Sequence, residues 1–253
     1  MLKNLPRIRG SDIVKKIIFF LLFLLLIYGA CAKRPPTPIA SNTVLLAGDS
    51  IMAGMGPEIA NQLKGTGNYR FIQKGKVSSG LCRPEFHDWP AKLKRLMIEH
   101  HPRLVLFCIG TNDTQSISTK KFGSVPFLSP EWKDEYKMRL GELIRTAREY
   151  GADIAFLSPP VMGRKNLNSG VQHINAIIRS VCREHNVQYV DLWYRLADKN
   201  GQFQRYMTIG HERVEIRAKD GVHVRKRGNQ LLAQKAINDL QALLFSHGIE
   251  GNL

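Results

Sequence analysis

A serine, an aspartate and a histidine in this sequence have the residue types and the local spacing that ester hydrolysis requires. Ser50 follows an apolar run directly, at the end of Gly48-Asp49-Ser50. Asp220 and His223 lie three residues apart near the end of the chain. This spacing lets the carboxylate meet one imidazole nitrogen while the other nitrogen faces a nucleophile from elsewhere. The set predicts acyl transfer to a serine hydroxyl that a histidine activates and an aspartate orients.

Each of these signals also has a purely structural interpretation. A serine that follows a strand is commonly the N-cap of a helix. An aspartate shortly before a histidine is commonly a capping residue beside a surface side chain. Taken singly, the structural interpretations are the better ones, so the chemical hypothesis depends on Ser50, Asp220 and His223 occurring together.

Short apolar runs alternate with amphipathic stretches along the chain. We expect strands at 43–47, 69–73, 103–109, 152–157 and 187–192, and helices at 57–63, 89–99, 130–150, 170–185 and 225–246. A long loop at 116–130 and a small hairpin at 201–217 complete the prediction. Continuous apolar strands separated by helices indicate a parallel sheet covered on both faces, a three-layer α/β/α domain.

Polar turns follow several of the predicted strands. They are Gly48-Asp49-Ser50, Gly110-Thr111-Asn112-Asp113 and Ser158-Pro159-Pro160. In open parallel sheets the ligand crevice lies outside the carboxyl ends of the strands. We therefore expect the three turns to share one rim.

The polar turns and the histidine loop together resemble the SGNH hydrolases, also called GDSL esterases and lipases. The resemblance rests on four blocks in order: Gly48-Asp49-Ser50, Ser79-Gly80, Gly110-Thr111-Asn112-Asp113 and Asp220-Gly221-Val222-His223. It implies a flavodoxin-like, doubly wound sheet, Ser50 as nucleophile and no metal or cofactor. It also implies an oxyanion hole made by the backbone N–H groups of Ser50 and Gly80 and the side chain of Asn112. The asparagine that usually precedes the glycine of the second block is not evident here.

A narrower resemblance comes from the segment 78–90, together with Asn112-Asp113-Thr114-Gln115 and Trp132. These residues look like the DUF459 branch of exported bacterial SGNH proteins, a branch whose label supplies no substrate.

Four polar residues in or near these blocks are candidate substrate contacts: Asp49, Arg83, Asp113 and Gln115. Arg83 has an alternative role in a salt bridge to Glu85 or Asp88. For Asp113 and Gln115 the alternative is the capping of their own loop.

The first 32 residues are typical of a signal peptide or an N-terminal membrane anchor. A basic opening leads into the apolar run 17–28 and then into Gly29-Ala30-Cys31, and a proline-rich tether follows at 33–42. Cleavage or lipidation at Cys31 and an uncleaved anchor are equal alternatives. In each case we expect the catalytic domain, residues 43–253, on the periplasmic side of the inner membrane or outside the cell.

The composition favours one globular domain with anionic partners. A hydrophobic fraction of 43% in 253 residues is enough for one packed α/β core. The formal net charge of +16 attracts anionic membrane or peptidoglycan groups, unless it serves solubility alone. Nucleic acid is not an expected partner, because the export signal removes the chain from it and no nucleic-acid motif occurs.

The cysteines indicate no metal site and no disulfide framework. Apart from Cys31, the chain has Cys82, Cys108 and Cys182, an odd number without metal-binding spacing. We expect Cys108 and Cys182 in the core, whereas Cys82 lies near the predicted site.

These observations predict an exported serine esterase that acts on acyl esters, with O-acetyl groups of envelope polysaccharide or peptidoglycan as the expected substrate. One alternative is a lipid esterase of the lipase or lysophospholipase type. The other is a non-catalytic protein that binds or assembles the envelope on the same fold.

Overall fold

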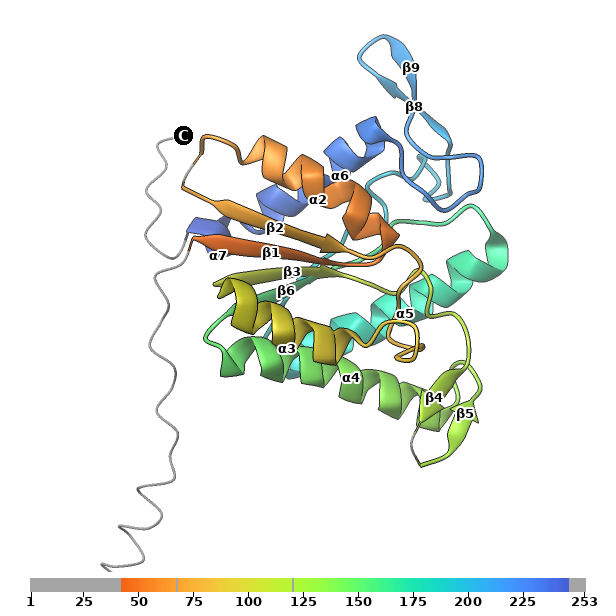
Figure 1. Ribbon diagram of the computed structural model, residues 1–253. Helices are drawn as coiled ribbons and strands as arrows, with labels where there is room; N and C mark the ends of the chain where they lie inside the picture. Colours follow the sequence, from red (N-terminus) through yellow and green to blue (C-terminus); the bar gives the residue numbers. More distant parts are fainter. Residues whose placement is uncertain (1–41, 67, 120, 246–253) are drawn as a thin grey trace, which may run out of the picture. The chain divides into compact units, whose positions relative to one another are not determined.

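A five-stranded parallel sheet forms the centre of the molecule (Figure 1). The computed structural model describes residues 42–66, 68–119 and 121–245. The strands β1 (Thr43–Gly48), β2 (Arg70–Gly75), β3 (Leu104–Cys108), β6 (Asp153–Leu157) and β7 (Gln188–Val190) lie in the order β2-β1-β3-β6-β7. This order is that of a flavodoxin-like, doubly wound sheet, which confirms the predicted fold class.

Helices cover both faces of the sheet (Figure 1). One face carries α2 (Ser50–Gln62), α6 (Lys226–Asp239) and α7 (Gln241–Phe245), and the other carries α3 (Trp89–His100), α4 (Pro130–Glu149) and α5 (Lys165–Glu184). Side chains of each strand alternate between the two layers, so Leu46 packs with the first group of helices and Leu45 with the second. The predicted three layers are therefore confirmed.

The burial of each strand explains how apolar its sequence is. All residues of β1 and β3 are buried, which accounts for their continuous apolar runs. The edge strand β2 is partly exposed along its length, and its sequence is correspondingly more polar. Cys108 and Cys182 are buried with free thiols, as the sequence predicts.

Two small hairpins flank the sheet. β8 (Tyr206–Ile209) pairs with β9 (Glu212–Glu215), which confirms the hairpin expected within 201–217. β4 (Ile117–Thr119) pairs with β5 (Gly123–Val125), although the sequence predicts only a loop there. Strands of three residues are too short to show a periodic pattern, so this hairpin had no readable signal.

Helix boundaries differ from the sequence prediction at several ends. α2 begins at Ser50, directly after the buried strand, and continues through Pro57, whereas the residue pattern predicts a helix only over 57–63. α5 begins at Lys165 rather than at 170. The single closing helix expected at 225–246 is two helices, because the chain leaves the α6 path at Leu240.

The expected export segment at 1–32, and the tether at 33–42 except for Asn42, lie outside the described residues. Within the described part of the chain, no helix combines the length and the apolar character needed to cross a bilayer. The described residues all fall in one compact unit.

Candidate active site

Asp220 and His223 form a hydrogen-bonded pair on the loop between β9 and α6. The Nδ1 atom of His223 lies 2.7 Å from Oδ2 of Asp220. The other carboxylate oxygen accepts the backbone N–H groups of Val222 at 2.8 Å and of His223 at 3.0 Å. An ionised carboxylate can only accept, so Nδ1 carries the proton and Nε2 is left as a base.

The charge of Asp220 is stabilised by the same contacts. Partial burial acts to raise the pKa of this carboxyl, but hydrogen bonds from the His223 ring and from two backbone N–H groups outweigh it. The pKa of Asp220 therefore lies well below its usual range. The carboxylate stays ionised and fixes the orientation of the imidazole ring.

A buried arginine holds this loop in place. The guanidinium of Arg217 is fully buried and donates to the carbonyl oxygens of Val161 at 2.6 Å and Val222 at 2.9 Å. It also lies 4.9 Å from the centre of the Phe203 ring. Arg217 thus joins the histidine loop to the segment after β6. Burial lowers its pKa to about 10, which the nearby Asp220 opposes.

Ser50 is partly exposed at the point where β1 gives way to α2, and the preceding Asp49 fixes this turn. The carboxyl group of Asp49 accepts the backbone N–H of Ile51 at 2.9 Å and that of Thr111 at 3.1 Å. It therefore joins the turn after β1 to the turn after β3. Asp49 has no exposed surface, so the structure corrects its assignment as a substrate contact.

The start of α2 lies beside the start of α6. A Cβ atom on Gly54, one turn beyond Ser50, would lie 2.8 Å from Nδ2 of Asn229 in α6. Asn229 in turn donates to the carbonyl oxygen of Val224, the residue after His223, at 3.3 Å. This packing brings the serine turn and the histidine loop to the same side of the molecule. Among the hydrogen bonds of the described residues, none joins the Ser50 hydroxyl to His223.

The second block is attached to the third through Asn112. The side-chain amide of Asn112 donates one hydrogen to the carbonyl oxygen of Ser79 at 2.9 Å. Gly80 is next in the chain, and a Cβ atom there would lie 2.1 Å from Oδ1 of Asp113. Only glycine fits this position. The two expected oxyanion donors, Gly80 and Asn112, thus belong to one hydrogen-bonded unit.

Trp89 supports the loop that carries Gly80. Its indole N–H donates to the hydroxyl oxygen of Ser79 at 3.0 Å, and that hydroxyl donates to the carbonyl oxygen of Lys76 at 2.7 Å. Ser78 adopts a left-handed conformation with φ of 62°. These contacts hold the loop without the asparagine that usually precedes the glycine.

Asp113 is a structural anchor in the interior. Its carboxyl oxygens accept the backbone N–H of Cys82 at 2.9 Å and the hydroxyl of Tyr136 at 3.0 Å. Burial raises the pKa of Asp113 above its usual value. The side chain has no exposed surface, which corrects the expectation that it contacts substrate. Burial also raises the pKa of the Cys82 thiol, so this cysteine is not a reactive group.

Gln115 and Arg83 remain at the surface. The side-chain amide of Gln115 donates to the carbonyl oxygen of Asn112, so loop capping is present. Arg83 donates to the carbonyl oxygen of Ser78 at 3.0 Å and lies 4.9 Å from the Phe86 ring. Within the described residues Arg83 forms no ion pair with Glu85 or Asp88.

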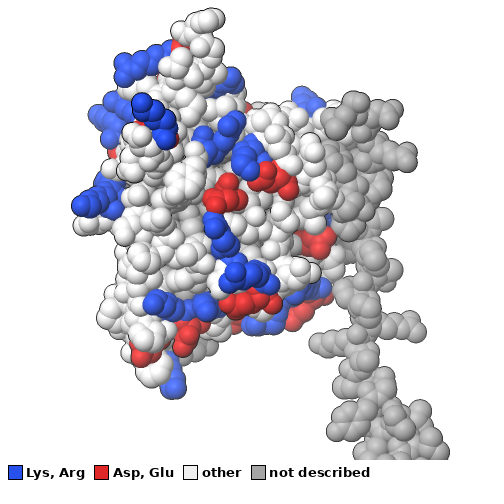
Figure 2. All heavy atoms as spheres, turned by 180° about the vertical axis from the view of Figure 1, so that it is seen from behind, with Lys and Arg blue, Asp and Glu red and all other residues white. Residues whose placement is uncertain are grey.

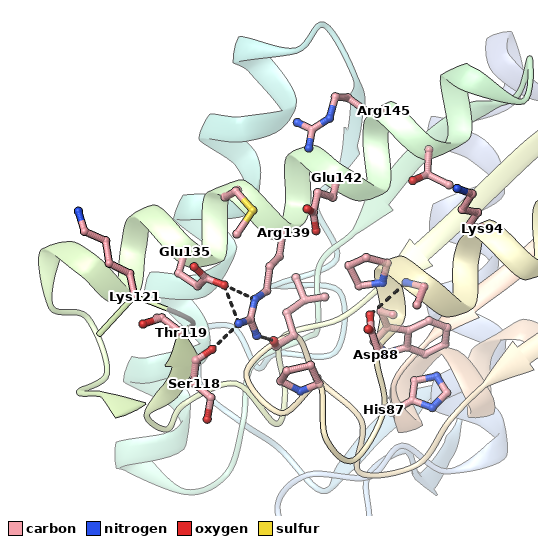
Figure 3. A pocket seen from close by; sticks show the side chains of 18 of the residues that line it. His87, Asp88, Lys94, Ser118, Thr119, Lys121, Glu135, Arg139, Glu142 and Arg145 are labelled. Carbon is pink, nitrogen blue, oxygen red and sulfur yellow. Dashed lines mark hydrogen bonds and ion pairs between the residues drawn. The ribbon is translucent and has the colours of Figure 1, made fainter. Parts of the chain in front are cut away.

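A cavity of about 890 Å³ lies between α3 and α4 and reaches Gly80 at one end (Figure 3). Arg139 on its wall pairs with Glu135 and donates to the carbonyl oxygens of Leu81 and Ser118. These bonds fix the segment that follows Gly80. In the described part of the chain, no three His, Cys, Asp or Glu side chains gather as metal ligands would.

Solved structures of two GDSL-type proteins and of an acetylxylan esterase share this fold. A GDSL-like lipase from Bacteroides thetaiotaomicron VPI-5482 is 15% identical, with a TM-score of 0.58 over 86% of this chain and 96% of the other. A lipolytic protein of the G-D-S-L family from Veillonella parvula DSM 2008 is 18% identical, with a TM-score of 0.55 over 78% and 96%. A catalytic mutant of an acetylxylan esterase from Geobacillus stearothermophilus is 17% identical, with a TM-score of 0.59 over 86% and 99%.

The chain belongs to the family DUF459, described as a protein of unknown function, whose pattern matches residues 43–239. This match confirms the narrower resemblance found in the sequence. No curated protein matches the sequence significantly.

The titration of Asp49 gives a first prediction. Burial raises its pKa to about 7, although hydrogen bonds from Ile51 and Thr111 oppose the shift. Between about pH 4 and about pH 7 the folded protein keeps a proton that the unfolded chain has released, so the free energy of unfolding falls as pH rises. Asp49→Asn removes this dependence. Urea unfolding across that range should show that the free energy of unfolding of the unsubstituted chain declines relative to that of Asp49→Asn. A difference between the two free energies that does not change with pH would contradict the prediction.

A second prediction concerns Arg217. Arg217→Met leaves the carbonyl groups of Val161 and Val222 without their donor. Amide hydrogen exchange of residues 218–224 should accelerate by about tenfold to a hundredfold, because hydrogen bonds to charged groups contribute about 1.5–3 kcal/mol. Mass spectrometry can compare this segment with β1, which should not change. Arg213→Met, at an exposed arginine of β9, is the control. Equal exchange rates in the two variants would show that Arg217 does not hold the histidine loop.

Proposed function

We propose that this chain is an exported serine esterase that hydrolyses acyl esters, with O-acetyl groups of cell-envelope polysaccharide or peptidoglycan as substrate. The observation that carries the proposal is the Asp220–His223 pair, joined at 2.7 Å on a loop beside the helix that begins with Ser50. A carboxylate that fixes one imidazole nitrogen and leaves the other as a base is the arrangement that activates a serine hydroxyl.

In the proposed reaction the Oγ atom of Ser50 attacks the ester carbonyl, and Nε2 of His223 takes the hydroxyl proton. Asp220 stabilises the imidazolium that forms. When the C–O bond of the ester breaks, His223 returns the proton to the leaving alcohol. Water then attacks the acyl-enzyme with His223 as base again, which releases the acid and restores Ser50.

Three donors are available for the oxyanion in this proposal. They are the backbone N–H groups of Ser50 and Gly80 and the side-chain amide of Asn112. One hydrogen of the Asn112 amide is bound to Ser79, so the second is free for a substrate oxygen. Ser50 also opens α2, where the helix dipole favours negative charge.

The mechanism also requires a hydrogen bond between the Ser50 hydroxyl and Nε2 of His223. Catalytic hydrogen bonds are often long in the free enzyme and tighten when substrate binds. We propose that the two side chains, both accessible to solvent, meet when the ester occupies the site.

Charge and similarity support the choice of substrate. The net charge of +16 attracts the anionic polymers of a cell envelope. Figure 2 shows lysine and arginine side chains gathered where the β8–β9 hairpin projects, and Arg205 and Arg213 lie there over the Tyr206 ring. One of the solved structures with the same fold is that of an acetylxylan esterase.

The reaction itself can be tested with a small ester and an active-site label. The purified chain should hydrolyse p-nitrophenyl acetate and react covalently with a fluorophosphonate. Ser50→Ala should abolish labelling and lower the rate by roughly a thousandfold or more, because the nucleophile is lost. Ser124→Ala, at an exposed serine of β5, is the matched control and should behave as the native chain. Folded native protein that neither labels nor hydrolyses would refute the proposal.

The substrate class needs a separate measurement. Acetate release from O-acetylated peptidoglycan should require Ser50. A series of p-nitrophenyl esters should show about a tenfold preference for acetyl over octanoyl, since a site that fits a two-carbon acyl group leaves an eight-carbon chain without a pocket. A preference for long chains would favour the lipid esterase instead. Saturable glycan binding without hydrolysis of any ester would favour the non-catalytic alternative.

A further inference from the structure

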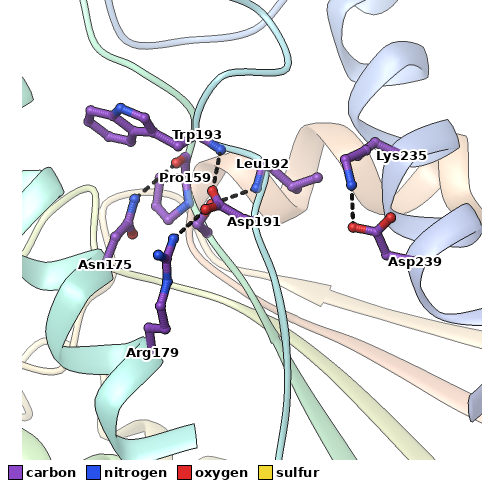
Figure 4. Close-up of polar contacts among 9 residues, drawn as sticks. Pro159, Asn175, Arg179, Asp191, Leu192, Trp193, Lys235 and Asp239 are labelled. Atoms are coloured by element: carbon purple, nitrogen blue, oxygen red, sulfur yellow. Dashed lines mark hydrogen bonds and ion pairs between the residues drawn. The ribbon is translucent and has the colours of Figure 1, made fainter. Parts of the chain in front are cut away.

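A pocket of about 330 Å³ lies at the edge of the sheet, between α5 and the segment that follows β7 (Figure 4). Its walls combine aromatic rings with polar side chains. The residues that matter here are Asn175, Arg179, Tyr189, Asp191, Trp193 and Tyr194. None of them belongs to the proposed esterase site.

Tyr194 gives the pocket an exposed aromatic face. Its side chain is 63% exposed, although an aromatic ring of this size normally packs against the protein. The ring edge is supported by the turn at Gly201, where a Cβ atom would lie 3.0 Å from it. One edge of the ring therefore lies against this turn, while most of its surface is available to a ligand.

Asn175 gives the pocket a buried acceptor. The residue is 5% exposed, and its side-chain amide nitrogen donates to the carbonyl oxygen of Pro159 at 3.2 Å. Its Oδ1 atom has almost no solvent-accessible surface and no hydrogen-bond partner within the described residues, so a donor from outside reaches it with a small movement of the pocket wall. A buried acceptor without a protein partner needs a donor from water or from a ligand.

Arg179 and Asp191 form the polar rim. They are ion-paired, and the other oxygen of Asp191 accepts the backbone N–H of Trp193 at 3.0 Å (Figure 4). The Arg179 guanidinium also lies 5.1 Å from the centre of the Tyr189 ring. The pair holds a fixed donor and a fixed acceptor at the mouth of the pocket, and its charges largely cancel.

We propose that this pocket binds a sugar ring of a glycan chain. A pyranose has an apolar C–H face that packs on an aromatic ring and hydroxyl groups that both donate and accept. Its C–H face lies on Tyr194, one hydroxyl donates to Oδ1 of Asn175, and others bond to Arg179 and Asp191. A purely apolar ligand would leave Asn175 unpaired. The hydroxyl groups of a sugar can also accept from Arg183, a second arginine of the wall.

The pocket is connected to the proposed esterase site through Trp193. This side chain lines the pocket and also packs in a small core with Val161, Val171 and Val222. Val222 lies between Asp220 and His223. A ligand that moves Trp193 would therefore also act on the packing of the histidine loop. This link to catalysis rests on the proposed function, whereas the binding of sugar does not.

Fluorescence titration tests the pocket without catalysis. Of the three tryptophans of the chain, Trp193 lines this pocket, whereas Trp89 and Trp132 pack in the core beneath α3 and α4. A change in emission that Tyr194→Ala weakens therefore reports Trp193. The full-length Ser50→Ala chain in detergent is titrated with tetrasaccharides of N-acetylglucosamine, xylose and glucose. At least one should bind saturably, and Tyr194→Ala in the same background should raise its dissociation constant by about tenfold, which corresponds to a lost aromatic contact.

Phe122→Ala is the matched control, because Phe122 is an aromatic residue of similar exposure on the β4–β5 connection, 54% exposed. It should not change the dissociation constant. Binding of no tetrasaccharide, or equal weakening by both substitutions, overturns the proposed pocket. Hydrolysis of p-nitrophenyl acetate by the native chain is measured in parallel. Hydrolysis without sugar binding overturns the pocket alone, and sugar binding without hydrolysis overturns the esterase alone.

Discussion

The carboxyl group of Asp49 is the contact on which the geometry of the candidate site depends. It bonds to backbone N–H groups that follow two neighbouring strands, β1 and β3, and so fixes the turns that carry Ser50 and Asn112 relative to each other. Asp113 joins the third block to the Gly80 loop in the same way, because its carboxyl group accepts the backbone N–H of Cys82. Arg217 does so for the histidine loop with a buried cation. Each loop of the site is thus tied to the sheet by a polar group in the interior, where hydrogen bonds are least exposed to competition from water.

The sequence predicts the sheet and the order of the blocks, because their signals are local. β1 and β3 are buried on both faces and therefore read as unbroken apolar runs. Arg217 and Trp89 could not be assigned in this way. Their partners, Val161 for Arg217 and Ser79 for Trp89, lie in other segments of the chain, and no spacing rule joins them. Only the folded chain shows which loop each of these side chains supports.

Asp49 and Asp113 show why polar residues at strand ends are easily misassigned. Carboxylates at the rim of a parallel sheet suit substrate binding, and residue types alone indicate that role for both. The turns beside them, however, contain backbone N–H groups that no strand or helix partner satisfies. Both carboxyl groups turn inward to meet these donors and are fully buried. The number of unpaired amides in a tight turn is a property of its conformation, which residue types alone do not reveal.

The three described cysteines, all buried and unpaired, have a consequence for how the protein matures. Thiol oxidation proceeds through the exposed thiolate, and burial raises the pKa of Cys82, Cys108 and Cys182 while it shields their sulfur atoms. After the proposed export, the folded domain would pass through an oxidising compartment with its thiols protected by packing. The maturation of these described residues would then be independent of the enzymes that form and shuffle disulfide bonds. The thiols would be open to oxidation mainly in the interval between export and folding.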